Sequence, residues 1–395
     1  MRAVLLKGPS QYEGTRTFID HAAAALERRG YRADVVDLLG METPILPILE
    51  AASAGPTAFA FSINMLGEAR DGFGRTMAQM FAAPHVVWHV DYILSQEQRL
   101  ETTPSDTALL MVDPTQVEAI ASIYGPDRFT NTGFCPHAAV GEAAPVPDDL
   151  ADWEGERDVP ILWCGTLQKL KTTPWADADA PTRKVFDDAY DLALSVEWIP
   201  PHEAMDQVLA SRGLDLSNPA YAGARRAARH LDVQVRCTRR FEFVKALAKT
   251  GLPVRICGLG WDADLYRFKN ATYEGAVPMS RMSELMRRSR IVLNTNGNFG
   301  GGSHERPLSA LLAGAAVFSD YSRFYGQAFE EGREISLFRW MDLKGGMAQL
   351  ADLAASPGKA RDIAAAGQRR VIAEHTWDSR IEVVLNAAGL PPTAQ

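Results

Sequence analysis

Three consecutive glycines and a serine stand before a histidine, a glutamate and an arginine in the stretch LNTNGNFGGGSHERPLSALLAG, residues 293–314. Glycine lets the backbone turn sharply and lets a ligand approach it closely. Imidazole and carboxylate groups can transfer protons, and a guanidinium group can bind an anion. The spacing of Leu308, Leu311 and Leu312 predicts a helix that begins between Ser303 and Pro307, where unpaired backbone amides attract phosphate. The pattern favours an anion-binding turn over the alternative, a surface loop before a capped helix.

Two other strand ends carry glycines beside groups that can bind phosphate. In ILWCGTLQKLK the apolar run ends in Gly-Thr and two lysines follow, so that backbone amides and an ammonium group could hold a diphosphate. In CGLGW two glycines and a tryptophan follow a strand, a weak signal because many strand ends carry such glycines. Solvated lysines and an ordinary turn explain the two patterns about equally well. The candidate residues at these strand ends are Gly165, Thr166, Lys169, Gly260 and Trp261.

Arginines cluster before a predicted helix in the segment VRCTRRFEF. One of Arg236, Arg239 and Arg240 could reach an anionic ligand, since guanidinium groups bind phosphates through paired hydrogen bonds. An exposed basic helix start is an equally good interpretation. We take Arg240 as the candidate ligand-binding residue of this group.

A histidine and an aspartate end an apolar strand in the segment VVWHVDY. A histidine close to a carboxylate can act as a general base near neutral pH, so His89 and Asp91 are candidate catalytic residues. A histidine in a strand is more often structural, and in that case Asp91 itself could be the base. His137, in CPHA, is a weaker candidate of the same kind.

Short apolar runs alternate with helical patterns in the first half of the chain. The apolar runs are uninterrupted by polar residues, as is typical of parallel strands that are covered on both faces. This alternation predicts a doubly wound α/β sheet. The expected strands are 3–7, 32–38, 57–63, 84–91 and 107–113, and the expected helices are 15–30, 68–81 and 116–125.

A second series of the same kind follows an aperiodic segment rich in proline, alanine and acidic residues. We therefore expect two Rossmann-like α/β domains with a cleft between them, because such folds bind ligands at the carboxyl ends of parallel strands. The last helix, around 376–388, is expected to return to the first domain. The expected parts are an N-terminal domain 1–140, a linker 141–160, and a C-terminal domain 161–395 with a helical insertion at 181–230.

Composition excludes several classes of protein. The net charge of −8 argues against non-specific binding of nucleic acids, which requires a basic surface. The four cysteines form no Cys-x-x-Cys pair, and the eight histidines are scattered, so we expect reduced thiols, a cytoplasmic protein and no zinc site. There is no run of eighteen apolar residues, so no transmembrane helix is expected.

The second half resembles the glycosyltransferases of the two-Rossmann-domain type, called GT-B, and most of all their CgeB-like or group 1-like branch. The likeness rests on the order of VRICGLGW, YEGAVPMSRMSELMRRSRIVLNTN and GSHERPLSALLAGAAVFSDY, from Ile161 onward. The first half resembles the family more loosely, through HVVWHVDY and LLMVDPTQVEAIASIYG. The resemblance implies a GT-B architecture and a hexosyltransferase-like activity.

This resemblance implies that a nucleotide-sugar donor binds the C-terminal domain and that a glycan or protein acceptor binds the N-terminal one. It implies no cofactor and no metal, because helix amides and basic side chains offset the charge of the leaving diphosphate. The Asp-x-Asp sequences at 177–179 and 262–264 are taken as chance. The implied catalytic residues of the C-terminal domain are His304 and Glu305. The implied donor-binding residues are Gly165, Thr166, Lys169, Arg240, Gly260, Trp261, Gly301, Gly302, Ser303, Arg306 and Ser309.

One position departs from the family pattern. Many retaining members carry a glutamate five residues before the glycine of the Ala-Gly pair, where it holds the donor ribose, and this chain has Ser309 there. Glu305 lies one helical turn earlier and could substitute for it. Two other functions fit the same fold: a nucleotide-sugar epimerase or hydrolase that needs no acceptor, and a non-catalytic surface-coat or binding protein.

Overall fold

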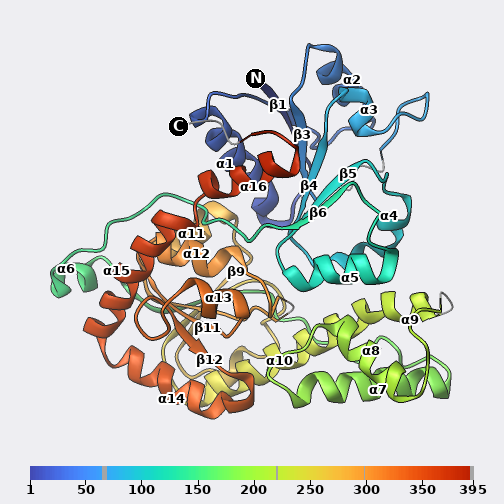
Figure 1. Cartoon of the computed structure of the whole chain (residues 1–395). Helices are drawn as coiled ribbons and strands as arrows, with labels where there is room; N and C mark the ends of the chain where they lie inside the picture. Colours follow the sequence, from blue (N-terminus) through green and yellow to red (C-terminus); the bar gives the residue numbers. More distant parts are fainter. Residues whose placement is uncertain (65–68, 219–220, 298, 392–395) are drawn as a thin grey trace. The chain divides into compact units, whose positions relative to one another are not determined.

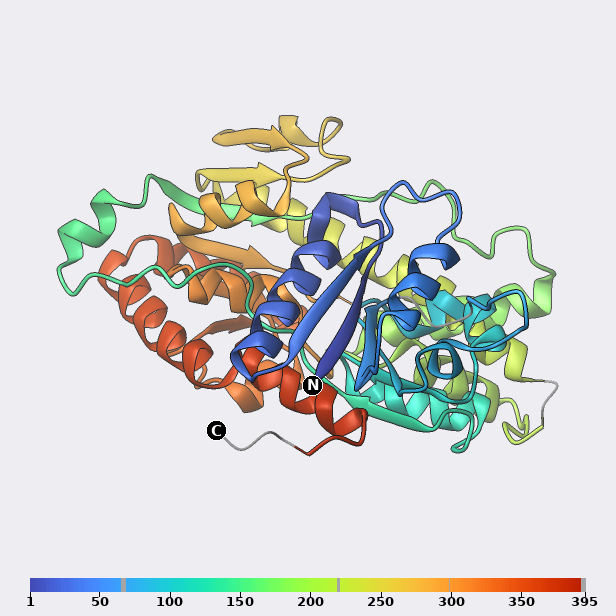
Figure 2. The same ribbon diagram turned by 90° about the horizontal axis from the view of Figure 1, so that it is seen from above.

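The structure is a computed structural model that describes residues 1–64, 69–218, 221–297 and 299–391. The chain forms two compact units, shown in Figures 1 and 2. Unit 1 comprises Met1–Val140 together with Glu374–Gln395, and unit 2 comprises Gly141–Ala373. Each unit is built around its own parallel sheet.

Unit 1 contains a six-stranded sheet in the order β2-β1-β3-β4-β5-β6, with every pair parallel. The chain moves outward from β1 to one edge and then returns to build the other edge, which is the doubly wound arrangement expected from the sequence. β3, β4 and β5 are buried along their whole length, in agreement with their uninterrupted apolar runs. The strands are β1 Arg2–Lys7, β2 Arg32–Asp37, β3 Phe59–Ile63, β4 His85–His89, β5 Thr107–Met111 and β6 Asn131–Phe134.

The helices of unit 1 agree with those expected at 15–30 and 116–125 and differ from the one expected at 68–81, and the helices Ile45–Ser53 and Glu97–Thr102 were not predicted. Residue 68 lies outside the described residues, and 69–76 are irregular with a turn at 72–73, so most of that predicted helix was wrong. The Asp71 carboxylate accepts hydrogen bonds from the backbone amides of Phe73 and Arg75, which fixes a turn there. Thr76 then begins the helix with a capping box. The helices are α1 Gly14–Arg28, α2 Ile45–Ser53, α3 Met77–Phe81, α4 Glu97–Thr102, α5 Pro114–Tyr124 and α16 Trp377–Ala387.

The last helix, α16, belongs to unit 1. Arg380 donates hydrogen bonds to the backbone oxygens of Pro136 and His137 at the end of the β6 segment. Trp377 packs edge-on against Trp88 of β4, with ring centroids 5.3 Å apart. The C-terminal segment therefore completes the core of the N-terminal sheet.

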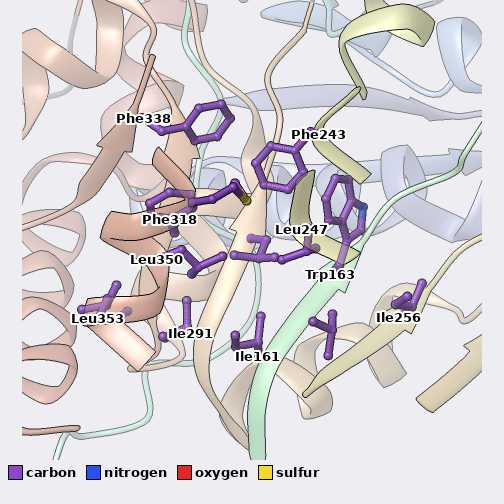
Figure 3. Packing of buried hydrophobic residues seen from close by; sticks show 14 of the residues in the cluster. Ile161, Trp163, Phe243, Leu247, Ile256, Ile291, Phe318, Phe338, Leu350 and Leu353 are labelled. Atoms are coloured by element: carbon purple, nitrogen blue, oxygen red, sulfur yellow. The ribbon is translucent and has the colours of Figure 1, made fainter. Parts of the chain in front are cut away.

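Unit 2 contains a second six-stranded parallel sheet, in the order β12-β11-β10-β7-β8-β9. Aromatic side chains of β7, β11 and β12 pack with those of α10 in one continuous cluster, as Figure 3 shows. The rings of Trp163 and Phe243 lie 4.8 Å apart at its centre. The strands are β7 Val159–Cys164, β8 Val254–Cys257, β9 Ala271–Gly275, β10 Ser289–Asn294, β11 Ala316–Asp320 and β12 Ser336–Phe338.

The helices of unit 2 lie before the first strand of this sheet, in an insertion between β7 and β8, and after later strands. A short helix, α6, occupies part of the segment that the sequence analysis treats as linker. Three helices and the start of α10 form the insertion between β7 and β8 (Figure 1). The insertion helices are α7 Ala180–Ser195, α8 Pro201–Ser211, α9 Ala222–Arg226 and α10 Ala228–Thr250. The others are α6 Leu150–Gly155, α11 Met279–Arg287, α12 Glu305–Leu312, α13 Arg323–Ala328, α14 Leu343–Ala354 and α15 Pro357–Glu374.

Candidate functional site

The turns that follow β7 and β8 fit tightly against each other through two glycines. A Cβ atom on Gly258 would lie 2.3 Å from the Gly165 carbonyl oxygen, and one on Gly260 would lie 2.1 Å from that of Leu167. Both glycines also have positive φ angles, +129° and +79°. Trp261 donates a hydrogen bond of 2.8 Å from Nε1 to the Gly165 oxygen and locks the two turns together. These glycines are therefore required for close backbone packing.

Gly258→Ala is expected to lower the free energy of unfolding by about 3 kcal/mol, because the clash adds to an unfavourable φ. A matched control is Gly275→Ala, at φ +72°, where no atom lies within 4 Å of the added Cβ. The control is expected to lose only about 1–2 kcal/mol, the cost of the left-handed backbone. Urea unfolding of both variants would measure the difference. Equal losses would mean that the turn can open to accommodate a methyl group.

Polar side chains that end β10 and β11 fix the loop before α12. The Asp320 carboxylate accepts hydrogen bonds from the backbone amides of Asn296 and Gly297, at 2.5 and 3.3 Å, and from Trp340 Nε1 at 3.1 Å. Burial raises the pKa of Asp320, and these donors oppose the rise. Asn296 Nδ2 donates to the carbonyl oxygen of Phe299, 2.6 Å away, within the loop. The loop is thus tied to the sheet by groups that the sequence analysis had not singled out.

The glycine run of this loop lies beneath the helical insertion. A Cβ atom on Gly300 would lie 2.0 Å from Cδ2 of Trp198, so the indole ring occupies the space that a side chain would need. Gly301, Gly302 and Ser303 are buried. The prediction that these glycines clear space for a ligand is therefore wrong at Gly300, where the space is taken by a tryptophan of the same unit.

The histidine and glutamate of the HER triplet contact each other at the start of α12. His304 Nδ1 lies 2.5 Å from Glu305 Oε2, and 3.3 Å from the backbone nitrogen of Arg306. A protonated Nδ1 donates to the carboxylate and cannot also accept from that amide, so we assign the proton to the shorter contact. Burial lowers the pKa of His304, and the Glu305 carboxylate opposes this. Tyr325 Oη accepts from the backbone nitrogen of His304 at 2.8 Å and holds the turn in place.

Three guanidinium groups converge at the carboxyl ends of β7 and β10. Arg240, on α10, donates to the Thr166 carbonyl oxygen at 2.9 Å and to Thr295 Oγ1 at 3.3 Å. Arg306, on α12, donates to Asn294 Oδ1 at 2.7 Å. Among the described residues, Arg240 forms no ion pair.

The pKa of Arg240 is lowered by the burial of its side chain and by the two positive charges beside it. Burial, and then the positive charges of Arg236 and Arg306, together lower that pKa to about 9. A guanidinium stays charged at neutral pH, so the shift reflects mainly the cost of burying the charge of Arg240 and, in addition, repulsion from the two neighbouring arginines. Arg236 is only weakly compensated, with its Nη2 3.9 Å from the Asp232 carboxylate. An anion placed among these groups would offset that cost.

The third arginine of the segment has a structural role. Arg239 donates hydrogen bonds to the carbonyl oxygens of Ala193, Val196 and Glu197, at 2.7–2.9 Å, and so caps the end of α7. Helical spacing separates the roles, because Arg236 and Arg240 are four residues apart and share a face. Arg240, the residue chosen from the sequence, therefore lies beside Arg236 and Arg306, whereas Arg239 does not belong to this group.

Two predicted donor-binding side chains are engaged elsewhere. The Lys169 ammonium pairs with the buried carboxylate of Asp264, which also pairs with Arg267 at 2.8 Å. Trp261 is completely buried in the hydrophobic cluster of unit 2 and offers no surface to a ligand. The side chain of Trp261 therefore supports the turn and cannot contact a donor, whereas a role of Lys169 in donor binding stays a prediction. Ser309 is also buried, on α12.

In unit 1, the two predicted catalytic residues differ in exposure. The His89 side chain is completely buried, and its Nδ1 is 2.9 Å from the backbone oxygen of Asp91, to which it donates. Burial lowers the pKa of His89, so the ring is neutral at pH 7. The Asp91 residue is exposed, and its Oδ2 accepts a hydrogen bond of 2.7 Å from Asn64 Nδ2. The geometry corrects the choice of His89 as a base and leaves Asp91 as the candidate.

The His137 side chain is also buried, packed against Trp88 with ring centroids 5.6 Å apart. In the part of the chain that the structure describes, no group of three or more His, Cys, Asp or Glu side chains is arranged to hold a metal ion. Likewise, none of the helices in the described ranges is both long and apolar enough to cross a membrane.

Comparison with known proteins identifies the fold. Residues 239–386 match the family model described as glycosyl transferase-like. None of the curated proteins compared with the chain matches it. Sucrose-phosphate synthase (tll1590) from Thermosynechococcus elongatus is similar in structure, with a TM-score of 0.56 and 11% identity over 98% of each chain.

The structure of Alr3699/HepE from Anabaena, determined in complex with UDP-glucose, is similar as well. Its TM-score is 0.55 at 11% identity, and the match covers 98% of this chain and 99% of that chain. At such low identity the likeness establishes the fold: two Rossmann-like domains, each with a six-stranded parallel sheet, as in the GT-B architecture.

Proposed function

We propose that this protein is a glycosyltransferase that moves a sugar from a nucleotide-sugar donor to a glycan or protein acceptor. The observation that carries the proposal is the group formed by Arg236, Arg240 and Arg306 at the carboxyl ends of β7 and β10. Ligands of open α/β sheets bind at this edge. The match to the glycosyl transferase-like family covers Arg240 and Arg306 and supports the proposal. The order of the motifs favours the CgeB-like branch of such enzymes.

In this function the arginine group binds the donor diphosphate and offsets the negative charge that develops as the sugar leaves. Guanidinium groups suit this role because they stay charged and bind phosphate oxygens in pairs. Arg240 is held by Thr166 and Thr295, so little reorganisation is needed during the reaction. Glu305, which contacts His304, lies one helical turn before Ser309 and takes the role of the ribose ligand. UDP-glucose is the ligand in the HepE structure, and a uridine diphosphate sugar is the first donor to test.

The acceptor binds unit 1 in this proposal, and Asp91 is the general base if the reaction inverts the sugar carbon. The exposed carboxylate of Asp91 is held by Asn64, which also accepts a hydrogen bond of 2.9 Å from the Val90 amide. The four unpaired cysteine thiols support a reducing compartment, the cytoplasm.

The transfer is proposed to need no metal, since the arginine group supplies the positive charge. Activity is expected to be unchanged in excess EDTA, measured as release of nucleoside diphosphate. The matched control adds Mg²⁺ or Mn²⁺ to the chelated enzyme. Loss of activity on chelation, with recovery on adding either ion, would contradict this part of the proposal.

A two-step experiment tests the function. A panel of nucleotide-sugars is first screened by thermal shift, where a ligand at a hundred times its Kd adds about 2.7 kcal/mol of stability. The stabilising donor is then incubated with and without candidate acceptors. Nucleoside diphosphate release that needs an acceptor supports a transferase. Release or epimerisation at full rate without one would favour an epimerase or hydrolase, and the absence of any stabilising nucleotide-sugar would contradict both.

A further inference from the structure

A groove runs along the outer side of α15, away from the arginine group. It consists of two adjoining hollows, of about 590 and 230 Å³, which share Arg333, Ala366 and Arg369. One wall is α15, and the other is formed by Pro147 and Asp148 and by the turn before β12. In Figures 1 and 2 the segment after residue 140 runs beside α15. All of the lining residues belong to unit 2.

The groove is long and has a floor of small side chains. The α15 residues that line it extend from Lys359 to Ala373, which at 1.5 Å per residue is roughly 20 Å. Between them lie Ala365 and Ala366, and these leave room for a chain-like ligand to lie close to the helix. The shape suits an extended molecule better than a compact one.

The charge of the groove is opposite to that of the whole chain. The net charge of the chain is −8. In the groove, five basic side chains, Arg333, Lys359, Arg361, Arg369 and Arg370, accompany three acidic ones, Asp148, Glu334 and Asp362. Arg333, Arg361 and Arg370 pair with neighbouring carboxylates. Lys359 and Arg369 form no ion pair with any residue that the structure describes. The positive charges of these two side chains are therefore available to an anionic ligand.

The groove and the arginine group lie at opposite edges of the sheet of unit 2. The groove includes Arg333 and Glu334, which directly precede β12, and therefore lies at the amino-terminal edge. The arginine group contacts Thr166 and Thr295, which directly follow β7 and β10. Since all six strands are parallel, one ligand at the groove would leave the other site accessible.

We propose that this groove binds a linear polyanion in which carboxylate or phosphate groups repeat along a carbohydrate or polyol backbone. Charge complementarity at Lys359 and Arg369 selects the anion, and the alanine floor accommodates the backbone. No aromatic side chain is among the described residues that line the groove, so it offers no platform for stacking nucleic-acid bases. The proposal does not depend on the enzymatic activity.

The test measures binding of two fluorescent probes to the full chain by anisotropy: oligogalacturonate, which carries carboxylates on a carbohydrate backbone, and a short poly(glycerol phosphate), which carries phosphates on a polyol backbone. Binding is expected to weaken with salt. The double variant Lys359→Ala, Arg369→Ala should weaken binding tenfold or more, since it removes the two positive charges of the groove that no carboxylate neutralises. The matched control, Lys249→Ala with Lys344→Ala, removes two exposed charges from the same unit and should bind as the wild type does. The probe that binds more tightly identifies the anion.

Several results would overturn the proposal. Binding of neither probe would do so, as would binding that survives the Lys359 and Arg369 changes. Loss of binding in Arg240→Ala would place the anion at the arginine group instead. Equal affinity for single-stranded DNA of the same charge, or for anionic vesicles, would show a non-selective surface. Because no step uses a nucleotide-sugar, failure here leaves the glycosyltransferase proposal untouched, and failure of that proposal leaves this one untouched.

Discussion

Arg240→Ala is expected to lower kcat/KM for the donor by about 10²–10³-fold, the usual effect of removing one fixed group that stabilises developing charge. Arg240 is held against Thr166 and Thr295 and forms no ion pair in the described ranges, so its charge is available to a diphosphate. Donor affinity should fall as well, and the thermal shift caused by the donor should shrink. Steady-state kinetics and thermal shift of the same variant measure both effects.

Two controls separate loss of binding from loss of fold. Without ligand, Arg240→Ala should unfold at nearly the wild-type temperature, because removing it also relieves repulsion from Arg236 and Arg306. Arg288→Ala removes an exposed arginine that pairs with Asp158, at the other edge of the sheet, and should leave donor kinetics unchanged. If Arg240→Ala keeps wild-type donor kinetics, the diphosphate does not bind among these arginines.

The sequence predicted the alternation of strands and helices well, because buried parallel strands and amphipathic helices leave strong local patterns. It did not predict where the helix that begins at Met77 starts, since the turn before it depends on the Asp71 carboxylate. The short helix α6 was also not predicted. Its apolar anchor, Trp153, is buried only because it packs on the cluster of unit 2. Such features depend on contacts between distant segments.

The residues of the candidate site divide in the same way, into those that local sequence patterns indicate and those that depend on contacts between distant segments. The HER triplet and Arg240 were found from local patterns, and the structure places both at one edge of the sheet. Lys169 pairs with Asp264, which lies ninety-five positions further along the chain, so no local sequence pattern could predict this ion pair. The contact of Trp198 with Gly300 is equally distant, so the glycine run pointed to a ligand where a tryptophan lies.

Asp91→Asn is expected to lower turnover by about 10²-fold or more, within the range of general acid–base catalysis, while donor affinity stays unchanged. The amide keeps the shape of the side chain and can still bond to Asn64, but it cannot accept a proton from an acceptor hydroxyl. The matched control is Asp127→Asn, an exposed aspartate of the same unit, which should keep full turnover. Single-turnover kinetics with saturating donor measures the step directly.

His89→Ala tests the alternative assignment of the base. The buried ring donates to the backbone oxygen of Asp91, so its loss leaves a cavity and releases the turn that carries the carboxylate. We therefore expect both a lower unfolding temperature and a lower turnover, whereas Asp91→Asn should affect turnover alone. Because burial lowers the pKa of His89 in the folded state, the unfolded state binds the proton more readily, so stability of the wild type should fall as the pH drops below about 6.5, and this contribution should be lost in His89→Ala. Normal turnover in Asp91→Asn would contradict the assignment and point to a retaining reaction, which needs no base on the acceptor side.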